Sequence, residues 1–344
     1  MITITVPASR QYDVVIGSGL LSSIGTRIAA ITKAKTVCVV SDSTVMPLYG
    51  AKILESLAQS GFSCCSFVFP AGEASKNGDQ YLALLNHLAQ HQLTRSDALI
   101  ALGGGVVGDL SGFAASAYMR GIDFYNIPTT LLSQIDSSIG GKTAINFGGV
   151  KNIVGAFYQP KKVLIDPDLL KTLPSRQIAN GLAEAIKMSL TSDKELFELF
   201  ENKAIEANLD EIIIRSLQIK KAVVEQDEKE AGLRKILNFG HTVGHGIESS
   251  EGMSELYHGE CVALGMLPMC GEEIRPRVLA VLKKCSLYRE PEYDWDKITD
   301  AAFHDKKADG NKVTVTLVNE AGNFELKTMG CLEVIELAKT CLEG

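Results

Sequence analysis

The 344-residue sequence lacks any apolar run long enough to cross a membrane. Its longer apolar stretches are interrupted by glycine or proline, whereas a membrane-spanning helix needs about 18 or more uninterrupted apolar residues. The first residues, MITITVPASRQYDVVIG, alternate apolar and polar side chains like a strand and lack the basic-then-apolar profile of a secretory signal. We therefore expect a soluble protein of the cytoplasm, with no membrane partner.

The sequence also lacks closely spaced cysteine pairs and an excess of basic charge. Its eight cysteines are scattered, with Cys64 and Cys65 adjacent and no CxxC pair, which argues against both a disulfide framework and a cysteine zinc site. The 34 basic and 41 acidic residues give a formal net charge of -7, without a Lys/Arg cluster that would suit a nucleic acid. A phosphate group must therefore be held by a local pocket.

Two kinds of residue pattern divide the chain. Apolar, β-branched runs at 36–41, 64–69, 98–105 and 124–130 alternate with helical stretches and predict a parallel α/β sheet. The pattern changes near 163–170, and apolar residues then recur mostly at helical spacing. A late strand-like run at 312–319 predicts a small hairpin that turns at 320–322. We expect a Rossmann-like α/β domain over 1–170 and a mainly α-helical domain over 171–344, with a site in the cleft between them.

A glycine-rich string follows the strand-like run that ends near residue 103. Gly103, Gly105 and Gly108 satisfy the GxGxxG pattern, and the helix-like DLSGFAASAYM comes next. Glycines there allow close backbone approach, and a helix N-terminus offers N–H groups to a pyrophosphate. The same pattern also suits a tight turn packed for structural reasons. Asp42, at the end of an earlier strand, is a candidate for ribose hydroxyls or for a helix cap.

Histidines and a carboxylate predict a metal site in the second half. His241 and His245 are four residues apart, so on a helix they share a face and either could ligate an ion. His258 stands at a predicted helix start, and Glu184 lies on an earlier predicted helix. Two histidines and one carboxylate leave an open position on zinc, as catalytic sites require. Capped or core histidines are the alternative.

Lysines beside glycine turns are candidates for anion binding. Lys142 follows two glycines in SSIGGKT, and the Lys151-Asn152 pair follows Gly149 and Val150. Such turns present both backbone N–H groups and a point charge.

Together these segments resemble the 3-dehydroquinate synthase family, within the sugar phosphate cyclases. The matching strings, in chain order, are YDVVIGSGLL (12–21), PAGEASK (70–76), GGGVVGDLSGFAASAYMRG (103–121), IPTTLLSQIDSSIGGKTAIN (127–146), KNIVGAFYQP (151–160), LPSRQIANGLAEAIK (173–187), DEKEAGLRKILNFGHTVGHGIE (227–248), HGECVALGM (258–266) and DKKADG (305–310). The resemblance implies an N-terminal NAD-binding domain, a C-terminal helical domain that binds a divalent metal (Zn²⁺ or Co²⁺) and the substrate, and a homodimer.

The resemblance also implies roles for individual residues. The implied metal ligands are Glu184, His241 and His258. The implied NAD positions are Asp42, Glu73, Lys76, Gly104, Gly105, Val106, Val107, Gly108, Asp109, Thr129, Thr130, Lys142 and Lys151. The implied substrate positions are Arg120, reaching across a dimer interface, Asp136, Lys142, Lys151, Asn152, Lys187, Lys220, Arg234, Asn238, His245, and Lys306 or Lys307. The implied catalytic residues are Lys142, Lys187, His245, Glu230 and Asn152.

The implied reaction converts 3-deoxy-D-arabino-heptulosonate 7-phosphate to 3-dehydroquinate and phosphate in the shikimate pathway, which leads to chorismate and the aromatic amino acids. NAD takes a hydride from carbon 5, phosphate is eliminated, the hydride returns, and an intramolecular aldol step closes the ring. Three alternatives remain open. They are another sugar phosphate cyclase (2-deoxy-scyllo-inosose or amino-dehydroquinate synthase), a metal-dependent polyol dehydrogenase, and an inactive nucleotide-binding module.

Overall fold

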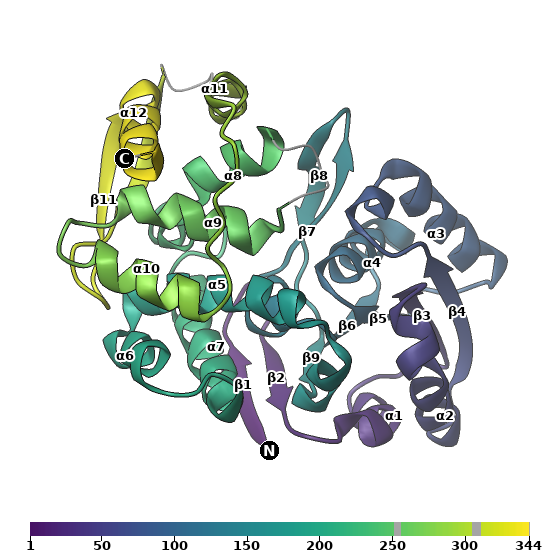
Figure 1. The fold of residues 1–344 in the computed structure, drawn as a ribbon. Helices are drawn as coiled ribbons and strands as arrows, with labels where there is room; N and C mark the ends of the chain where they lie inside the picture. Colours follow the sequence, from purple (N-terminus) through teal and green to yellow (C-terminus); the bar gives the residue numbers. More distant parts are fainter. Residues whose placement is uncertain (251–255, 305–310, 344) are drawn as a thin grey trace. The chain divides into compact units, whose positions relative to one another are not determined.

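The computed structural model describes residues 1–250, 256–304 and 311–343, which form two compact units, Met1–Leu173 and Pro174–Gly344 (Figure 1). The first unit is built on a mostly parallel sheet, and the second is mainly helical. This confirms the predicted fold class. Among the described residues, no helix combines the length and the apolar character that crossing a membrane requires.

A seven-stranded sheet forms the centre of the first unit. In spatial order its strands are β1 (Ile2–Val6), β2 (Tyr12–Ile16), β9 (Lys162–Ile165), β6 (Asp123–Pro128), β5 (Ala98–Gly103), β3 (Thr36–Asp42) and β4 (Ser63–Phe69). Strand β1 pairs antiparallel with β2, and every other neighbouring pair is parallel. The strands predicted from the apolar runs are confirmed. The sheet differs from the prediction in its antiparallel edge strand β1.

Both faces of this sheet are covered by helices, which explains why its inner strands read as nearly continuous apolar runs. The helices are α1 (Ile24–Ala29), α2 (Ala51–Gln59), α3 (Gly78–Gln90) and α4 (Gly105–Ala117). Side chains alternate along β3, so Val37 and Val39 pack in the core beneath α1 and α2. Cys38 and Val40 pack in the opposite core, beneath α3 and α4 (Figure 1).

A separate hairpin packs against α3 and α4. It consists of β7 (Lys142–Phe147) and β8 (Val150–Phe157), paired antiparallel. Gly148 and Gly149 form its turn with φ angles of 59° and 81°, a region that favours glycine. Lys142 and Lys151 lie at the starts of these strands, Lys142 directly after Gly140 and Gly141 and Lys151 just after Gly148 and Gly149, all four on left-handed backbone. The predicted glycine turns are present beside both lysines, which themselves belong to strands, and anion binding there stays a prediction.

Helix α5 (Ser175–Ser192) is the central element of the second unit, and its residues from Ala179 to Thr191 are all buried. It packs against α6, α7 and α9. The remaining helices are α6 (Lys194–Asn202), α7 (Leu209–Gln226), α8 (His241–Ser250), α9 (His258–Met266), α10 (Arg275–Lys284), α11 (Trp295–His304) and α12 (Cys331–Glu343). The predicted late hairpin is confirmed as β10 (Lys312–Leu317) and β11 (Glu325–Gly330), paired antiparallel.

Candidate functional site

The glycine-rich turn joins β5 to the N-terminus of α4. The helix begins at Gly105, before the predicted start at Asp109, so the second half of the motif forms its first turn. Gly104 is the N-cap residue, and neither a side-chain cap nor an acidic residue of the first turn occupies the helix N-terminus. A Cβ at Gly104 would come within 3.0 Å of Thr130 Cγ2. This open helix N-terminus fits the pyrophosphate of a dinucleotide.

Two predicted cofactor residues meet beside this helix. Lys76 Nζ lies 2.5 Å from Asp109 Oδ2, and the Lys76 side chain exposes 6% of its surface. Asn146, which the sequence did not single out, connects the same region to β7. Its side-chain amide donates to Glu73 Oε1 (2.8 Å), and its backbone N–H donates to the carbonyl of Lys76 (2.8 Å). The structure therefore brings Glu73, Lys76 and Asp109 into one polar cluster.

The β7–β8 hairpin separates two predicted anion-binding positions. The backbone N–H of Asn152 donates to Asn146 Oδ1 (2.9 Å), which places Asn152 near the turn end. Lys142 pairs with Phe157 at the other end of the hairpin. Asn146 lies four positions after Lys142 along β7, which corresponds to about 13 Å in an extended strand. Within this unit, Lys142 is therefore not beside Lys151 and Asn152.

Asp42 stabilises the turn that follows β3. Its Oδ1 accepts hydrogen bonds from the N–H groups of Thr44 (2.8 Å) and Val45 (2.9 Å), just before the helical segment Met46–Gly50, whose N-cap residue is Val45. Its contact with a ribose stays a prediction. Thr129 lies beside the glycine turn, because its N–H donates to the carbonyl of Gly103 (3.0 Å).

Glu184 and Lys187 lie one turn apart on α5, and their side chains are 1% and 2% exposed. Lys187 Nζ donates to Glu184 Oε2. The other oxygen, Glu184 Oε1, makes no hydrogen bond to any described residue. A buried polar atom left without a partner costs about 1–3 kcal/mol, so this oxygen fits a position that a bound cation would satisfy.

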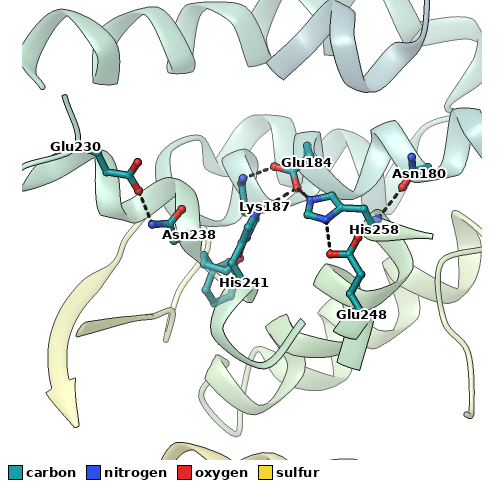
Figure 2. A network of polar contacts seen from close by, with 10 residues as sticks. Asn180, Glu184, Lys187, Glu230, Asn238, His241, Glu248 and His258 are labelled. Carbon is teal, nitrogen blue, oxygen red and sulfur yellow. Dashed lines mark hydrogen bonds and ion pairs between the residues drawn. The ribbon is translucent and has the colours of Figure 1, made fainter. Parts of the chain in front are cut away.

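Two histidines direct ring nitrogens at that oxygen (Figure 2). Glu184 Oε1 lies 3.7 Å from Nε2 of His241, the first residue of α8, and 3.5 Å from Nε2 of His258, the first residue of α9. The ligand nitrogens of His241, His245 and His258 also lie within 4.8 Å of one another, although His245 is more exposed. The structure brings the three predicted ligands together and keeps His245 adjacent to them.

The second ring nitrogens of the two histidines have partners that favour metal binding. Nδ1 of His241 lies 3.2 Å from the carbonyl of Phe239, and Nδ1 of His258 lies 3.2 Å from Glu248 Oε2 (Figure 2). A proton on Nδ1 donates in each bond and leaves Nε2 with its lone pair. Glu248 was missed at the sequence level, although it lies seven residues after His241, two turns along the same helix face.

The charges of this cluster suit a divalent cation. Burial opposes ionisation of Glu184, but the positive charge of Lys187 and the neighbouring imidazoles of His241 and His258 outweigh it and hold the pKa of the carboxyl well below its ordinary value. Burial and the charge of Lys187 hold the pKa of His241 well below the ordinary value. Burial also disfavours charge on His258, but the carboxylates of Glu184 and Glu248 raise its pKa to about 10. An incoming cation would therefore displace the His258 proton.

The glycines of the histidine segment serve helix packing instead of leaving room beside the rings. Gly240 has φ of 78°, and a Cβ there would meet the carbonyl oxygen of Val262 at 2.7 Å. A Cβ at Gly244 would meet the carbonyl oxygen of Cys261 at 2.9 Å. Helix α8 thus packs closely on α9, which brings their first histidines together.

Further predicted substrate residues belong to the same unit. Lys220 on α7 and Arg234 in the short segment before α8 are buried, and an Arg234 guanidinium nitrogen donates to the carbonyl of Glu228. Asn238 donates its side-chain amide to Glu230 Oε1 at 2.6 Å (Figure 2). Lys220, Arg234 and Asn238 therefore lie in the unit that also holds the Glu184 cluster, and their contacts with a substrate stay predictions.

The comparisons with known proteins agree along the chain. The profile described as 3-dehydroquinate synthase N-terminal matches residues 66–180, and that described as 3-dehydroquinate synthase C-terminal matches residues 181–308. A 3-dehydroquinate synthase of Lactococcus lactis subsp. cremoris is 43% identical over 345 residues, which cover 95% of this chain and 97% of the relative. One of Enterococcus faecalis is 41% identical over 347 residues, with 97% of each chain covered.

This chain belongs to the 3-dehydroquinate synthase family.

Solved structures of related cyclases share the fold of this 3-dehydroquinate synthase family member. A 2-deoxy-scyllo-inosose synthase complexed with carbaglucose-6-phosphate, NAD⁺ and Co²⁺ has a TM-score of 0.88 at 25% identity, with 99% of this chain and 100% of that chain covered. The 2-epi-5-epi-valiolone synthase of Streptomyces hygroscopicus subsp. jinggangensis, with NAD⁺ and Zn²⁺ bound, has a TM-score of 0.87 at 29% identity, with 99% of each chain covered. A glycerol dehydrogenase of Schizosaccharomyces pombe, at 18% identity and a TM-score of 0.67, shares the fold alone.

For the remaining predicted residues of this 3-dehydroquinate synthase family member, the structure gives burial and backbone conformation. Asp136 is half-buried in the short helical segment Ser133–Ser137, and Arg120 is exposed on left-handed backbone with φ of 64°. Lys306 and Lys307 lie outside the described residues. For all of these, the assigned roles stay predictions.

Proposed function

We propose that this protein is a 3-dehydroquinate synthase, which converts 3-deoxy-D-arabino-heptulosonate 7-phosphate to 3-dehydroquinate and inorganic phosphate. One observation carries the proposal. Relatives with that name are 40 to 43% identical over 94 to 97% of the chain, whereas the solved cyclases named for other products are 25 and 29% identical. The reaction breaks the carbon–oxygen bond to the phosphate group by elimination. This chemistry makes the protein a lyase of the shikimate pathway.

The two parts of the chain take different tasks in this proposal. Residues 1–170 bind NAD at the open N-terminus of α4, with the cluster of Glu73, Lys76 and Asp109 at its side. Residues 171–344 bind the metal and the substrate, with Glu184, His241 and His258 as metal ligands. Bound NAD accepts and returns a hydride, while a bound Zn²⁺ or Co²⁺ lowers the pKa of coordinated hydroxyl groups.

The chain's own side chains supply binding, charge and proton transfer. Lys187 compensates the buried charge of Glu184 and keeps that carboxylate ionised, ready to ligate. Lys220 and Arg234 bind the substrate carboxylate and hydroxyl groups, because a planar guanidinium suits a carboxylate. Asn238 is oriented toward the substrate by its hydrogen bond to Glu230. His245, exposed at the edge of the histidine cluster, exchanges a proton with the phosphate group.

Three further features belong to the same proposal. Lys142, Lys151 and Asn152 of the β7–β8 hairpin bind anionic groups of the substrate and the cofactor from the first part of the chain. The protein acts in the cytoplasm as a homodimer. Arg120, exposed on left-handed backbone, reaches toward the site of the partner subunit.

The test uses the purified full chain with the heptulosonate phosphate, zinc and a small amount of NAD, and follows both phosphate and the cyclic product. We expect many products per NAD, because the hydride returns within each cycle. Accumulation of stoichiometric NADH would contradict the proposal and favour a dehydrogenase. Glucose 6-phosphate, which lacks a carboxylate, is the matched control, and faster turnover of it would favour another cyclase. Glycerol with NAD should yield no NADH.

A further inference from the structure

A second group of metal-ligating side chains lies in the first unit, and the proposed function uses none of its members. Cys38 comes from β3, Cys65 from the edge strand β4 and His87 from α3. The two sulfur atoms and a ring nitrogen of His87 all lie within 4.8 Å of one another. Cys38 and Cys65 are register partners in neighbouring parallel strands, so both side chains point to the sheet face that α3 covers.

The separation of these atoms is close to what one tetrahedral ion requires. Zinc binds sulfur at about 2.3 Å and nitrogen at about 2.0–2.1 Å, so its ligand atoms lie about 3.5–3.8 Å apart. Binding would draw the half-buried side chains of Cys65 and His87 closer together. Cys38 is fully buried, and its position is fixed within the sheet.

The imidazole of His87 supplies an independent observation. Its Nε2 atom is buried and makes no hydrogen bond to any part of the chain that the structure describes. A neutral imidazole has a ring nitrogen with a lone pair to donate to a metal ion. A buried imidazole nitrogen beside two thiols is satisfied by a metal ion more fully than by the apolar groups around it.

A tetrahedral ion needs a fourth ligand. His91 follows His87 by one helical turn, and their ring centroids are 4.1 Å apart. It is exposed, so either its imidazole or a solvent molecule is a candidate for this position.

We propose that Cys38, Cys65 and His87 form a second metal site, distinct from the Glu184 cluster, that binds a structural zinc ion. The two thiolates make this a softer ligand set than the Glu184 cluster, which offers only oxygen and nitrogen donors. Binding of the ion releases the thiol protons to solvent.

The consequence of this site is structural. The ion would join β3, the edge strand β4 and helix α3, three elements at one side of the sheet. Edge strands are held by a single neighbour and are among the less protected parts of a sheet. Cys38 also lies four residues before Asp42 on β3, so the ion would stabilise the strand that carries a predicted NAD residue.

Cobalt titration of the full chain distinguishes the two sites. Metal-free protein kept under reducing conditions is titrated with Co²⁺, and absorption is followed in the visible and near-ultraviolet ranges. Thiolate ligands give an intense sulfur-to-cobalt charge-transfer band, which the oxygen and nitrogen donors of the Glu184 cluster cannot produce. We expect about two ions per chain, with this band from one of them.

Single variants assign the band to the cluster. Cys65→Ser and His87→Ala should each bind one ion fewer per chain. Cys65→Ser should also lose most of the charge-transfer intensity. Cys64→Ser is the matched control, because Cys64 is the adjacent, exposed cysteine outside the cluster, and it should keep both ions. Zinc should also protect Cys65 from alkylation while Cys64 still reacts, a measurement that needs no variant.

Three outcomes overturn the proposal. The first is a chain that binds a single Co²⁺ without the charge-transfer band. The second is a band that survives in folded Cys65→Ser protein, and the third is alkylation of Cys65 that zinc does not slow. Turnover of the heptulosonate phosphate is measured separately, so failure of this site leaves the proposed function untouched.

Discussion

Nε2 of His258 lies 3.5 Å from Glu184 Oε1, a buried carboxylate oxygen with no hydrogen bond to any described residue. The other oxygen of Glu184 accepts from Lys187, so the carboxylate is ionised and oriented from one side while its second oxygen faces two histidines. Such an arrangement fits a cation held between helices α5, α8 and α9.

The first prediction separates His241 from His245, which share one face of α8. His241→Ala removes a ligand nitrogen that faces Glu184, so bound metal and activity should both fall sharply. His245→Ala should retain near-stoichiometric metal and lose turnover, since a proton-transfer group is removed. Metal analysis of the two purified variants, checked for folding by circular dichroism, tests the assignment. Loss of metal from His245→Ala with retention in His241→Ala would reverse it.

A second prediction concerns Glu248, which fixes the ring of His258. Glu248→Gln keeps the size of the side chain but removes the charge that holds the proton on Nδ1. Metal affinity should fall about 10- to 100-fold, the usual effect of removing a partner behind a metal ligand. Competition with a chelator measures it. Glu273→Gln, an exposed glutamate on the same unit, should leave the affinity unchanged, and an equal loss in both variants would show that Glu248 has no special role.

The third prediction tests the β7–β8 hairpin. Lys142→Ala should weaken substrate binding by about 1.5–3 kcal/mol, as expected for a lost charge-assisted contact with phosphate, and NAD binding by much less. Calorimetric titration with each ligand gives both values. Lys33→Ala, an exposed lysine of the first unit, serves as the control. Equal losses for the two ligands would indicate that Lys142 contacts the cofactor or supports the hairpin.

Periodicity predicts the regular parts of this fold well. Runs such as 36–41 become buried parallel strands because helices cover both faces of the sheet, so the apolar pattern is continuous. The β7–β8 hairpin was missed because Lys142 and Lys151 stand beside glycines, and glycine-lysine pairs suit both anion-binding turns and strand ends. The start of α4 was placed too late because Gly105 and Gly108 have low helix propensity, which tertiary packing overrides.

The sequence predicts the candidate site less completely than it predicts the fold. The spacing of His241 and His245 predicts a shared helix face but cannot tell which ring meets Glu184, because that depends on how α8 packs on α9. Resemblance to a family distinguishes them. His241 Nε2 lies 3.7 Å from Glu184 Oε1, but His245 belongs to the same group of ligand atoms, so the distinction stays a prediction. The cluster of Cys38, Cys65 and His87 has no local spacing at all, since strand register and the position of α3 bring it together.

The last prediction concerns Asp193, which links three helices of the second unit. It ends α5 and caps α6, where its Oδ1 accepts from the N–H of Leu196 (3.0 Å). Arg215 of α7 binds both carboxylate oxygens, at 2.9 Å from Nε and 2.6 Å from Nη2. Burial opposes ionisation of Asp193, but the bonds from Arg215 and Leu196 outweigh it and lower the pKa of Asp193.

Because the folded-state pKa is lowered, the ionised carboxylate stabilises the fold above its unfolded pKa of about 3.9, and this stability is lost as the pH falls through the folded-state pKa. Asp193→Asn can still cap α6 but cannot pair with Arg215. At pH 7 it should therefore lower the free energy of unfolding by about 1.5–3 kcal/mol. The difference in unfolding free energy between the two proteins should shrink as the pH falls below about 4. There Asp193 becomes protonated and is then neutral, like the asparagine that replaces it.

Urea unfolding followed by fluorescence measures this difference, because the chain has one tryptophan and Trp295 belongs to the same unit as Asp193. Glu195→Gln is the matched control. Glu195 also pairs with Arg215, but its side chain is 80% exposed, so its loss should cost about 0–1 kcal/mol. A destabilisation by Asp193→Asn that stays constant from pH 7 to below pH 4 would show that the charge of Asp193 does not stabilise the joined helices.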